Sequence, residues 1–215
     1  MFQSSRKPKS GFGSALSIAE LVYHSVVRNV RKQHNNAFIA IAMNMLQTVM
    51  FVVAFYVMFS ILGMRGSAVR GDFLVYLMSG IFLYLTHVKA LGAVAGSEGP
   101  ASPMMQHAPM NTIIAIASAA VGSLYIQVLS LFVILFIYHV AVTPISIDQP
   151  FAAFGMMLTA WFTGCALGLV MLAIKPWFPS FVTIFSTVYQ RANMIASGKM
   201  FLANSLPGYM LAMFD

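Results

Sequence analysis

Five long apolar runs, separated by shorter polar segments, set the pattern of hydrophobic and polar positions along the chain. A transmembrane helix needs about 20 mostly apolar residues, and each run is long enough to supply one. The pattern therefore predicts an all-α polytopic membrane protein. Its transmembrane domain covers residues 35–215, with spans at about 37–62, 73–95, 112–138, 151–174 and 181–205.

The polar segment between the second and third runs, residues 96–111, contains three prolines and two glycines. An irregular backbone cannot face the hydrocarbon, because its N–H and C=O groups would stay unpaired there. We therefore expect this segment to be a loop at the membrane face, in water or against another protein.

The chain before the first run divides into two parts. Residues 1–14 are basic and rich in glycine, serine and proline, which is typical of a mobile terminus. Residues 15–34 place apolar side chains such as Leu16 and Val26 on one side of a helix and charged side chains on the other. This pattern predicts an amphipathic helix in the membrane interface, with these cations directed at lipid headgroups: Arg28, Arg31 and Lys32.

Composition supports insertion into a membrane, and the distribution of charge predicts the orientation of the chain across it. Charged residues make up 8% of the chain and hydrophobic residues 60%, whereas soluble domains have about 25% charged residues. The net charge is +7, and six cations against one acid, Glu20, precede the first run. This asymmetry predicts a cytoplasmic N-terminus, and alternation of the spans then places residues 96–111 in the cytoplasm too. Binding of nucleic acid is not expected in so hydrophobic a chain.

Polar and aromatic residues of the first run gather on one helical face, and two interpretations of this face stay open. Amides and hydroxyls are costly in hydrocarbon unless they are paired or face a cavity. The favoured interpretation is a packing face, where these groups hydrogen-bond to neighbouring helices. The alternative is the wall of a translocation path. The face consists of Asn44, Gln47, Thr48, Phe51 and Phe55.

Polar residues also interrupt the second and fifth runs. His87 and Lys89, in the second run, are expected to extend toward the cytoplasmic interface rather than to form a proton relay. In the fifth run Gln190, Asn193, Ser197 and Asn204 lie near one face, with Arg191 and Lys199 interspersed. The candidates for the translocation path in this run are Asn193, Ser197 and Lys199.

Small residues at four-residue spacing predict two sites of close helix packing. One pair is Gly92 and Gly96 in the second run, and the other is Gly164 and Gly168 in the fourth. The single cysteine, Cys165, excludes an intramolecular disulfide and is interpreted as a packing residue.

Catalytic motifs are missing from the sequence. Gly198 and Lys199 are followed by Met200, not by the serine or threonine of a nucleotide-binding P-loop, and no zinc-binding motif occurs. The chain has five acids, which leave no paired carboxylates for acid–base catalysis. The sequence therefore predicts a protein that is not an enzyme and holds no metal or cofactor. A passive channel, or a transport subunit powered by another protein, fits better.

Four local stretches are informative when they are taken in order: FLVYLMSG at 73–80, APMNTIIA at 108–115, WFP at 177–179, and SGKMF at 197–201 followed by LP at 206–207. Together they resemble the permease subunit of bacterial ABC exporters of capsular polysaccharide and O-antigen. The order of elements is similar too: a basic interfacial helix, two spans joined by a short outer loop, an inner loop rich in proline and glycine, and a third span. The similarity covers roughly residues 18–207.

Two features depart from this family. Lys199 stands where the family usually has an apolar residue. The family also continues into an Asn-Pro-Leu motif and a sixth span, so we expect that the C-terminus is truncated.

The resemblance implies a homodimer in the bacterial inner membrane with two ABC ATPase subunits beneath it. The ATPases would bind ATP and Mg²⁺, and lipid-linked polysaccharide would pass along the dimer interface, lined in part by the first and fifth spans. The interfacial helix would rest on the ATPase and on membrane lipids. The inner loop would transmit the motion of the ATPases through Glu98, Pro100, Pro103, Met104, Met105, His107 and Pro109. Two alternatives stay open: an ABC permease for a drug or lipid, or a membrane scaffold subunit that transports nothing.

Overall fold

The structure, a computed structural model, describes residues 19–27, 37–61, 72–97, 99, 111–145, 147 and 149–196. Several predicted sites lie outside these residues. They are residues 1–14, the cations of the interfacial helix, most of the inner loop and two candidates for the translocation path: Arg28, Arg31, Lys32, Glu98, Pro100, Pro103, Met104, Met105, His107, Pro109, Ser197 and Lys199.

Every regular element in the described part of the chain is a helix, and no strand occurs there. The prediction of an all-α polytopic membrane protein is confirmed, because four helices are long and apolar enough to cross a membrane. A further helix, α7 (Pro179–Ala196), follows them, and residues 19–27 are also helical. The four long helices are α2 (Ala37–Ile61), α3 (Phe73–Ala95), α5 (Thr112–Ala141) and α6 (Pro150–Ile174).

The composition of α7 differs from that of the four long helices. It carries Gln190, Arg191 and Asn193 in its second half, together with several hydroxyl side chains. It is not among the helices that are apolar enough to cross a membrane. Residues 197–205 of the predicted fifth span lie outside the described residues, so this span stays a prediction.

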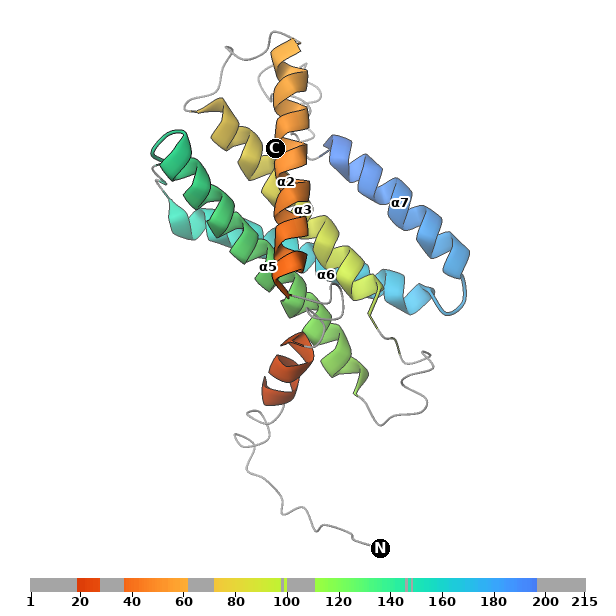
Figure 1. Cartoon of the computed structure of the whole chain (residues 1–215). Helices are drawn as coiled ribbons and strands as arrows, with labels where there is room; N and C mark the ends of the chain where they lie inside the picture. Colours follow the sequence, from red (N-terminus) through yellow and green to blue (C-terminus); the bar gives the residue numbers. More distant parts are fainter. Residues whose placement is uncertain are drawn as a thin grey trace, which may run out of the picture.

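The central helix of the bundle is α3, which contacts α2, α5, α6 and α7 (Figure 1). Half of its most apolar stretch is buried, against 22–28% in the other three long helices. Leu77, Ile81 and Leu85 of α3 pack with Phe55 and Phe59 of α2 in an apolar core. Because α3 is enclosed by its neighbours, a side chain that interrupts its apolar sequence must find a place inside the bundle.

The closest helix pair is α3 with α6, and glycine makes this approach possible. A Cβ atom on Gly164 would lie 2.3 Å from the His87 carbonyl oxygen, and one on Gly168 would lie 2.8 Å from the Val94 Cβ. Both distances are too short for any side chain, so these positions require glycine in the present packing. The predicted close packing at this pair is confirmed.

Capping side chains mark the two ends of the bundle. Asp72 accepts a hydrogen bond from the Leu74 N–H at the start of α3 (3.0 Å), and Asn111 accepts one from the Ile113 N–H at the start of α5 (2.9 Å). Such caps satisfy N–H groups that have no partner within the helix. Since α2 and α5 end where α3 begins, we call this side the Asp72 end and the opposite side the Asn111 end (Figure 1).

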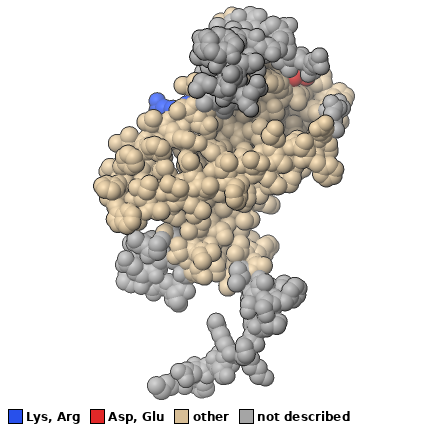
Figure 2. Space-filling view, turned by 180° about the vertical axis from the view of Figure 1, so that it is seen from behind, with Lys and Arg blue, Asp and Glu red and all other residues tan. Residues whose placement is uncertain are grey.

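The outer surface of the bundle is apolar, as expected for contact with lipid. Large side chains such as Phe136, Phe151 and Phe162 are exposed, Phe151 by 93%. The face in Figure 2 is almost free of charged side chains over the described residues. A soluble protein rarely exposes so continuous an apolar surface.

The helical residues 19–27 contact the bundle near the Asn111 end. The Ser25 hydroxyl donates a hydrogen bond to the Ser118 hydroxyl of α5 at 3.0 Å. Glu20 and His24 lie 3.9 Å apart on the exposed side, while Leu21 and Tyr23 are also exposed. The predicted interfacial position of this helix stays a prediction.

Candidate binding pocket

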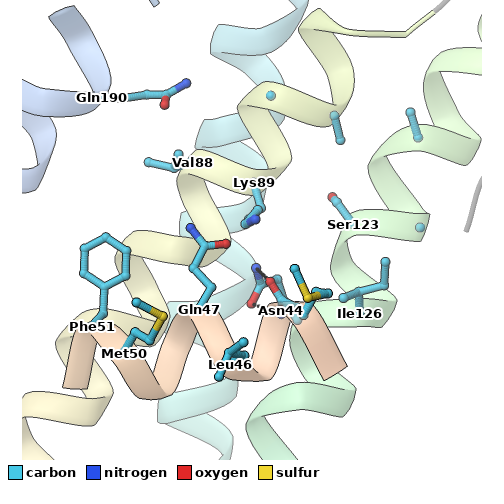
Figure 3. Close-up of a pocket in the computed structure, with 16 residues that line it drawn as sticks. Asn44, Leu46, Gln47, Met50, Phe51, Val88, Lys89, Ser123, Ile126 and Gln190 are labelled. Atoms are coloured by element: carbon cyan, nitrogen blue, oxygen red, sulfur yellow. Dashed lines mark hydrogen bonds between the residues drawn. The ribbon is translucent and has the colours of Figure 1, made fainter. Parts of the chain in front are cut away.

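A pocket of about 750 Å³ lies between α2, α3, α5 and α7 (Figure 3). Its volume is in the range of roughly 300–1,000 Å³ that is typical of small-molecule sites. The wall combines apolar side chains with amides, a hydroxyl and one ammonium group. The lining residues are Met43, Asn44, Leu46, Gln47, Met50, Phe51, Val88, Lys89, Gly92, Ala93, Ala119, Gly122, Ser123, Ile126, Gln127 and Gln190.

One wall of the pocket is a buried hydrogen-bond network between α2 and α5. The Asn44 amide nitrogen donates to the Ser130 hydroxyl at 3.0 Å and to the Gln127 side-chain oxygen at 3.4 Å. The Gln127 nitrogen donates back to the Asn44 oxygen at 3.4 Å. All three side chains are buried. A polar group in hydrocarbon needs a hydrogen-bond partner, and the Asn44 amide has one on the neighbouring helix. The packing interpretation therefore accounts for Asn44.

Two more residues of the predicted polar face lie inside the packed helices. The Thr48 hydroxyl donates to the Asn44 carbonyl oxygen of its own helix at 2.9 Å, and its side chain is fully buried. Phe55 belongs to the apolar core. Neither residue lines the pocket.

The remaining two residues of that face, Gln47 and Phe51, do line the pocket. The Phe51 ring lies near those of Phe55 and Tyr84, with both centroid distances at 6.3 Å. Gln47 is half-buried and directs its amide toward Lys89 (Figure 3). The face is thus divided between packing and pocket, and its role in translocation stays a prediction.

Lys89 of α3 lines the pocket, where it is half-buried. It lies among α2, α5 and α7 on the enclosed helix α3, and the expectation that it extends toward the cytoplasmic interface stays a prediction. The sequence shows Lys89 as a cation inside an apolar run, but whether its side chain faces a cavity depends on the packing of the other helices.

The glycine pair in α3 differs from the pair in α6. Gly92 lines the pocket, and no described atom outside its own helix backbone lies within 4 Å of where its Cβ would be. For Gly96 the close neighbours are backbone atoms of α3 itself. The predicted close approach of another helix at this pair is wrong, because the face holding Gly92 borders the cavity.

Gln190 of α7 completes the pocket wall. Its backbone carbonyl oxygen accepts a hydrogen bond from the Tyr84 hydroxyl of α3 at 3.2 Å, which holds this part of α7 beside the pocket. Asn193, one turn further along, is half-buried and does not line it. Ser123 and Gln127 of α5 are lining residues that sequence reasoning missed, because a single polar residue in an apolar helix does not reveal which neighbour it faces.

His87 connects three helices rather than extending toward an interface. Its Nδ1 lies 3.2 Å from the Ala160 carbonyl oxygen and 3.1 Å from the Thr163 hydroxyl, both in α6. Since a carbonyl accepts only, Nδ1 carries a proton, and Nε2 lies 2.9 Å from the Tyr189 hydroxyl of α7. The imidazole thus connects α3 to α6 and α7, and the expectation that it extends toward the cytoplasmic interface is wrong.

At the Asp72 end, a polar cluster joins α3 to α5. The Tyr138 hydroxyl donates to the Asp72 carboxylate, and the Thr143 hydroxyl donates to the same oxygen at 3.2 Å. The hydrogen bond from Tyr138, followed by that from the Leu74 N–H, lowers the pKa of Asp72. This carboxylate is therefore ionised near neutral pH and engaged in fixing the helix ends.

Metal-binding side chains do not converge in the described part of the chain. No cluster of three His, Cys, Asp or Glu side chains lies within reach of one metal ion among those residues. Cys165 is partly buried and has no disulfide partner. The pocket can bind a molecule through hydrogen bonds, charge and apolar contact.

Comparison of the chain with protein families, with curated proteins and with solved structures finds no match. The assignment of function therefore depends on the pocket, on the arrangement of the helices and on the local resemblance in the sequence.

Proposed function

We propose that this protein is the permease subunit of an ATP-driven ABC exporter that moves capsular polysaccharide, O-antigen or a related glycan across the bacterial inner membrane. The observation that carries the proposal is a pocket with amide and ammonium groups, walled in part by three helices that are long and apolar enough to cross a membrane. Polar groups at such depth typically serve a polar solute or its pathway. The local resemblance supplies the class of cargo.

In this proposal a separate ATPase docks at the Asn111 end, which faces the cytoplasm. Two contacts support coupling from that end. The Lys175 ammonium donates to the Ala95 carbonyl oxygen at 3.2 Å, which ties the end of α6 to the end of α3. A Cβ on Gly99, within the predicted inner loop, would lie 3.3 Å from the Leu172 side chain of α6. Force on the loop would thus reach α3 and α6 together.

Movement of α3 would change the pocket directly, because α3 contributes Val88, Lys89, Gly92 and Ala93 to its wall. The close packing at Gly164 and Gly168 makes α3 and α6 one mechanical unit. We propose that ATP and Mg²⁺ bound by two ATPase subunits drive this unit in a homodimer. The inner loop, residues 96–111, is the coupling element.

Copurification tests the coupling. The tagged full chain is purified in mild detergent from its native host, and copurifying proteins are identified by mass spectrometry. An ATPase with a nucleotide-binding P-loop should accompany the wild type, and deletion of residues 100–109 should release it. The matched control is deletion of residues 64–69, which join α2 to α3 at the Asp72 end and should leave the ATPase bound. Retention of the ATPase after the first deletion would contradict the docking role of the loop.

A cellular assay separates the cargo classes. Disruption of the gene should trap lipid-linked glycan on the cytoplasmic face and reduce glycan at the cell surface. Unchanged surface glycan with an altered export of drugs or lipids would favour the alternative permease. No change in any export, together with no associated ATPase, would favour a scaffold subunit.

A further inference from the structure

Lys89 is the one charged residue among those that line the pocket. No described residue forms a hydrogen bond or an ion pair with its ammonium group. The two acids in the described part of the chain are engaged elsewhere: Glu20 lies beside His24, and Asp72 binds Tyr138 and Leu74. At about 1.5 Å per residue, Asp72 lies roughly 25 Å from Lys89 along α3. The positive charge in the pocket therefore has no compensating carboxylate among these residues.

Two carboxamides share this lack of a partner. The side chains of Gln47 on α2 and Gln190 on α7 line the same pocket and form no hydrogen bond with any described residue. Asn44 and Gln127, by contrast, pair with each other. Polar groups inside a protein are normally paired. Side chains from three helices thus line one cavity with N–H donors that have no partner among the described residues, and Figure 3 draws all three around this cavity.

This donor set suits an anion with several oxygen atoms. An ammonium group and two amide N–H donors can each bind a different oxygen of a phosphate, and hydrogen bonds between charged groups are the stronger ones. No carboxylate in the lining would repel such an anion. A cation would meet Lys89 and is therefore disfavoured as the occupant.

The mouth of the pocket indicates where the anion comes from. Met43, Leu46 and Met50 of α2 line the pocket and are also exposed, Met50 by 63%. They lie within a helix that is apolar enough to cross the membrane, so this side of the pocket meets lipid chains rather than water. Methionine side chains adapt well to flexible apolar ligands. The pocket therefore has an anion site inside and an apolar border outside.

The depth of the site agrees with the dimensions of a lipid. Lys89 lies about 9 Å along α3 from Ala95, the last residue of the helix at the Asn111 end. The hydrocarbon core of a bilayer is about 30 Å thick, so this position lies between the bilayer centre and the headgroups at the Asn111 end. From here Lys89 meets a headgroup that enters sideways from the leaflet at the Asn111 end.

We propose that this pocket binds the phosphate of an anionic membrane lipid from the leaflet at the Asn111 end, with Lys89 as counter-ion and Gln47 and Gln190 as hydrogen-bond donors. The acyl chains lie along Met43, Leu46 and Met50. The site does not depend on the proposed transport function, since the pocket is formed by a single chain and no ATPase is needed to fill it.

Native mass spectrometry of the delipidated full-length chain in neutral detergent tests the proposal. Dioctanoyl phosphatidylglycerol, dioctanoyl phosphatidylcholine and inorganic phosphate are the probes. We expect the anionic lipid to bind more tightly than the zwitterionic lipid, by about tenfold. Both lipids carry the phosphate, but the choline cation of the zwitterionic lipid would lie close to the Lys89 ammonium group and be repelled by it. Inorganic phosphate at the same concentration should not compete, because it lacks the chains that contact α2. Equal binding of the two lipids, or occupation by inorganic phosphate alone, would overturn the proposal.

Variants place the binding in this pocket. Lys89→Gln should lower the affinity for phosphatidylglycerol about tenfold, and Lys89→Arg should restore it to within about threefold of wild type. Lys175→Gln is the matched control, since this exposed lysine lies outside the pocket, and its effect should stay within about threefold. Unchanged binding in Lys89→Gln would refute the site.

A second variant keeps the test decisive if Lys89→Gln fails to fold. Gly92 lines the pocket, and a Cβ there meets no described atom within 4 Å, so Gly92→Leu can fill the cavity without disturbing helix packing. It retains every charge. We expect it to lower phosphatidylglycerol binding about tenfold, and full retention of binding would equally overturn the proposal.

Discussion

Pairing of polar groups decides the role of each polar residue in this membrane bundle. Asn44 and Gln127 bind each other across two helices, and the His87 imidazole bridges three helices. Gln47 and Lys89 have no partner among the described residues and face a cavity instead. An unpaired polar group is costly in hydrocarbon. The paired side chains therefore stabilise the helix packing, whereas the proposed ligand accounts for the side chains that face the cavity.

Replacement of Asn44 tests this division at the residue scale. Asn44→Leu leaves the buried Gln127 amide without its partner, and we expect it to lower the free energy of unfolding by about 1–2 kcal/mol. Removal of both groups in Asn44→Leu with Gln127→Leu should lower it by less than the sum of the two single variants. Reversible unfolding in mixed micelles measures these free energies.

Gln47→Leu is the control on the same helix face. Its amide lacks a described partner, so its replacement should change the free energy of unfolding by only a few tenths of a kcal/mol. If Gln47→Leu destabilises the fold as much as Asn44→Leu, the distinction between packing and pocket residues is wrong.

Glycine positions control packing at the scale of elements. Gly164 and Gly168 of α6 let α3 approach closely, whereas Gly92 of α3 leaves space at the pocket. The same sequence pattern therefore produces a helix contact in one place and a cavity wall in the other. The difference depends on which neighbour the glycine face meets.

Substitution of Gly164 tests the α3–α6 contact. A Cβ at this position would lie 2.3 Å from the His87 carbonyl oxygen, so Gly164→Ala must push the two backbones apart. We expect a loss of about 1–3 kcal/mol in the free energy of unfolding, measured in the same micelles.

The matched control for Gly164→Ala is Gly155→Ala, also in α6. No described atom outside its own helix backbone lies within 4 Å of where its Cβ would be, and alanine favours a helix over glycine by up to about 1 kcal/mol. This variant should be neutral or more stable than wild type. Equal destabilisation of the two variants would show that α6 tolerates no side chain for reasons other than the contact with α3.

At the scale of the whole molecule, four long apolar helices place the Asp72 end and the Asn111 end on opposite sides of a membrane. The excess of cations before the first span supports the proposal that the Asn111 end faces the cytoplasm. In this topology the helical residues 19–27, the end of α3 and the turn after α6 all lie at the same face of the membrane.

Cysteine labelling in intact cells tests this topology. Cys165 is first replaced by Ala, and single cysteines are then placed at Val142, at the Asp72 end, and at Trp177, at the Asn111 end; both side chains are exposed. A membrane-impermeant maleimide should label Val142→Cys from outside, and should label Trp177→Cys only after permeabilisation. The reverse pattern would invert the proposed orientation, and labelling of both from outside would contradict the spans.

Much of the fold followed from the pattern of apolar runs. The predicted boundaries of α3 and α6 agree with the structure to within one residue, while α5 extends to Ala141, three residues beyond the prediction. Prolines and the capping residues Asp72 and Asn111 mark these ends locally. Such signals act within one stretch of chain and do not depend on how the helices pack against one another.

The pocket was only partly predictable. Gln47 and Phe51 were candidates from the sequence, but Thr48 and Phe55 shared the same face and are buried in packing instead. Lys89, Gly92 and Gln127 were assigned elsewhere or not at all. Residues on one helical face point in similar directions, but whether they meet a helix or a cavity depends on how the other helices cross.

The sequence by itself determined that this chain is helical and has segments suited to a membrane, because the length and apolarity of a segment decide whether it can cross the hydrocarbon. It also determined where helices begin, because caps and prolines act on neighbouring backbone groups. Only the tertiary structure decided which polar groups are paired and which are free. That outcome depends on contacts between residues such as Asn44 and Gln127, which are far apart in the chain and meet only when α2 packs against α5.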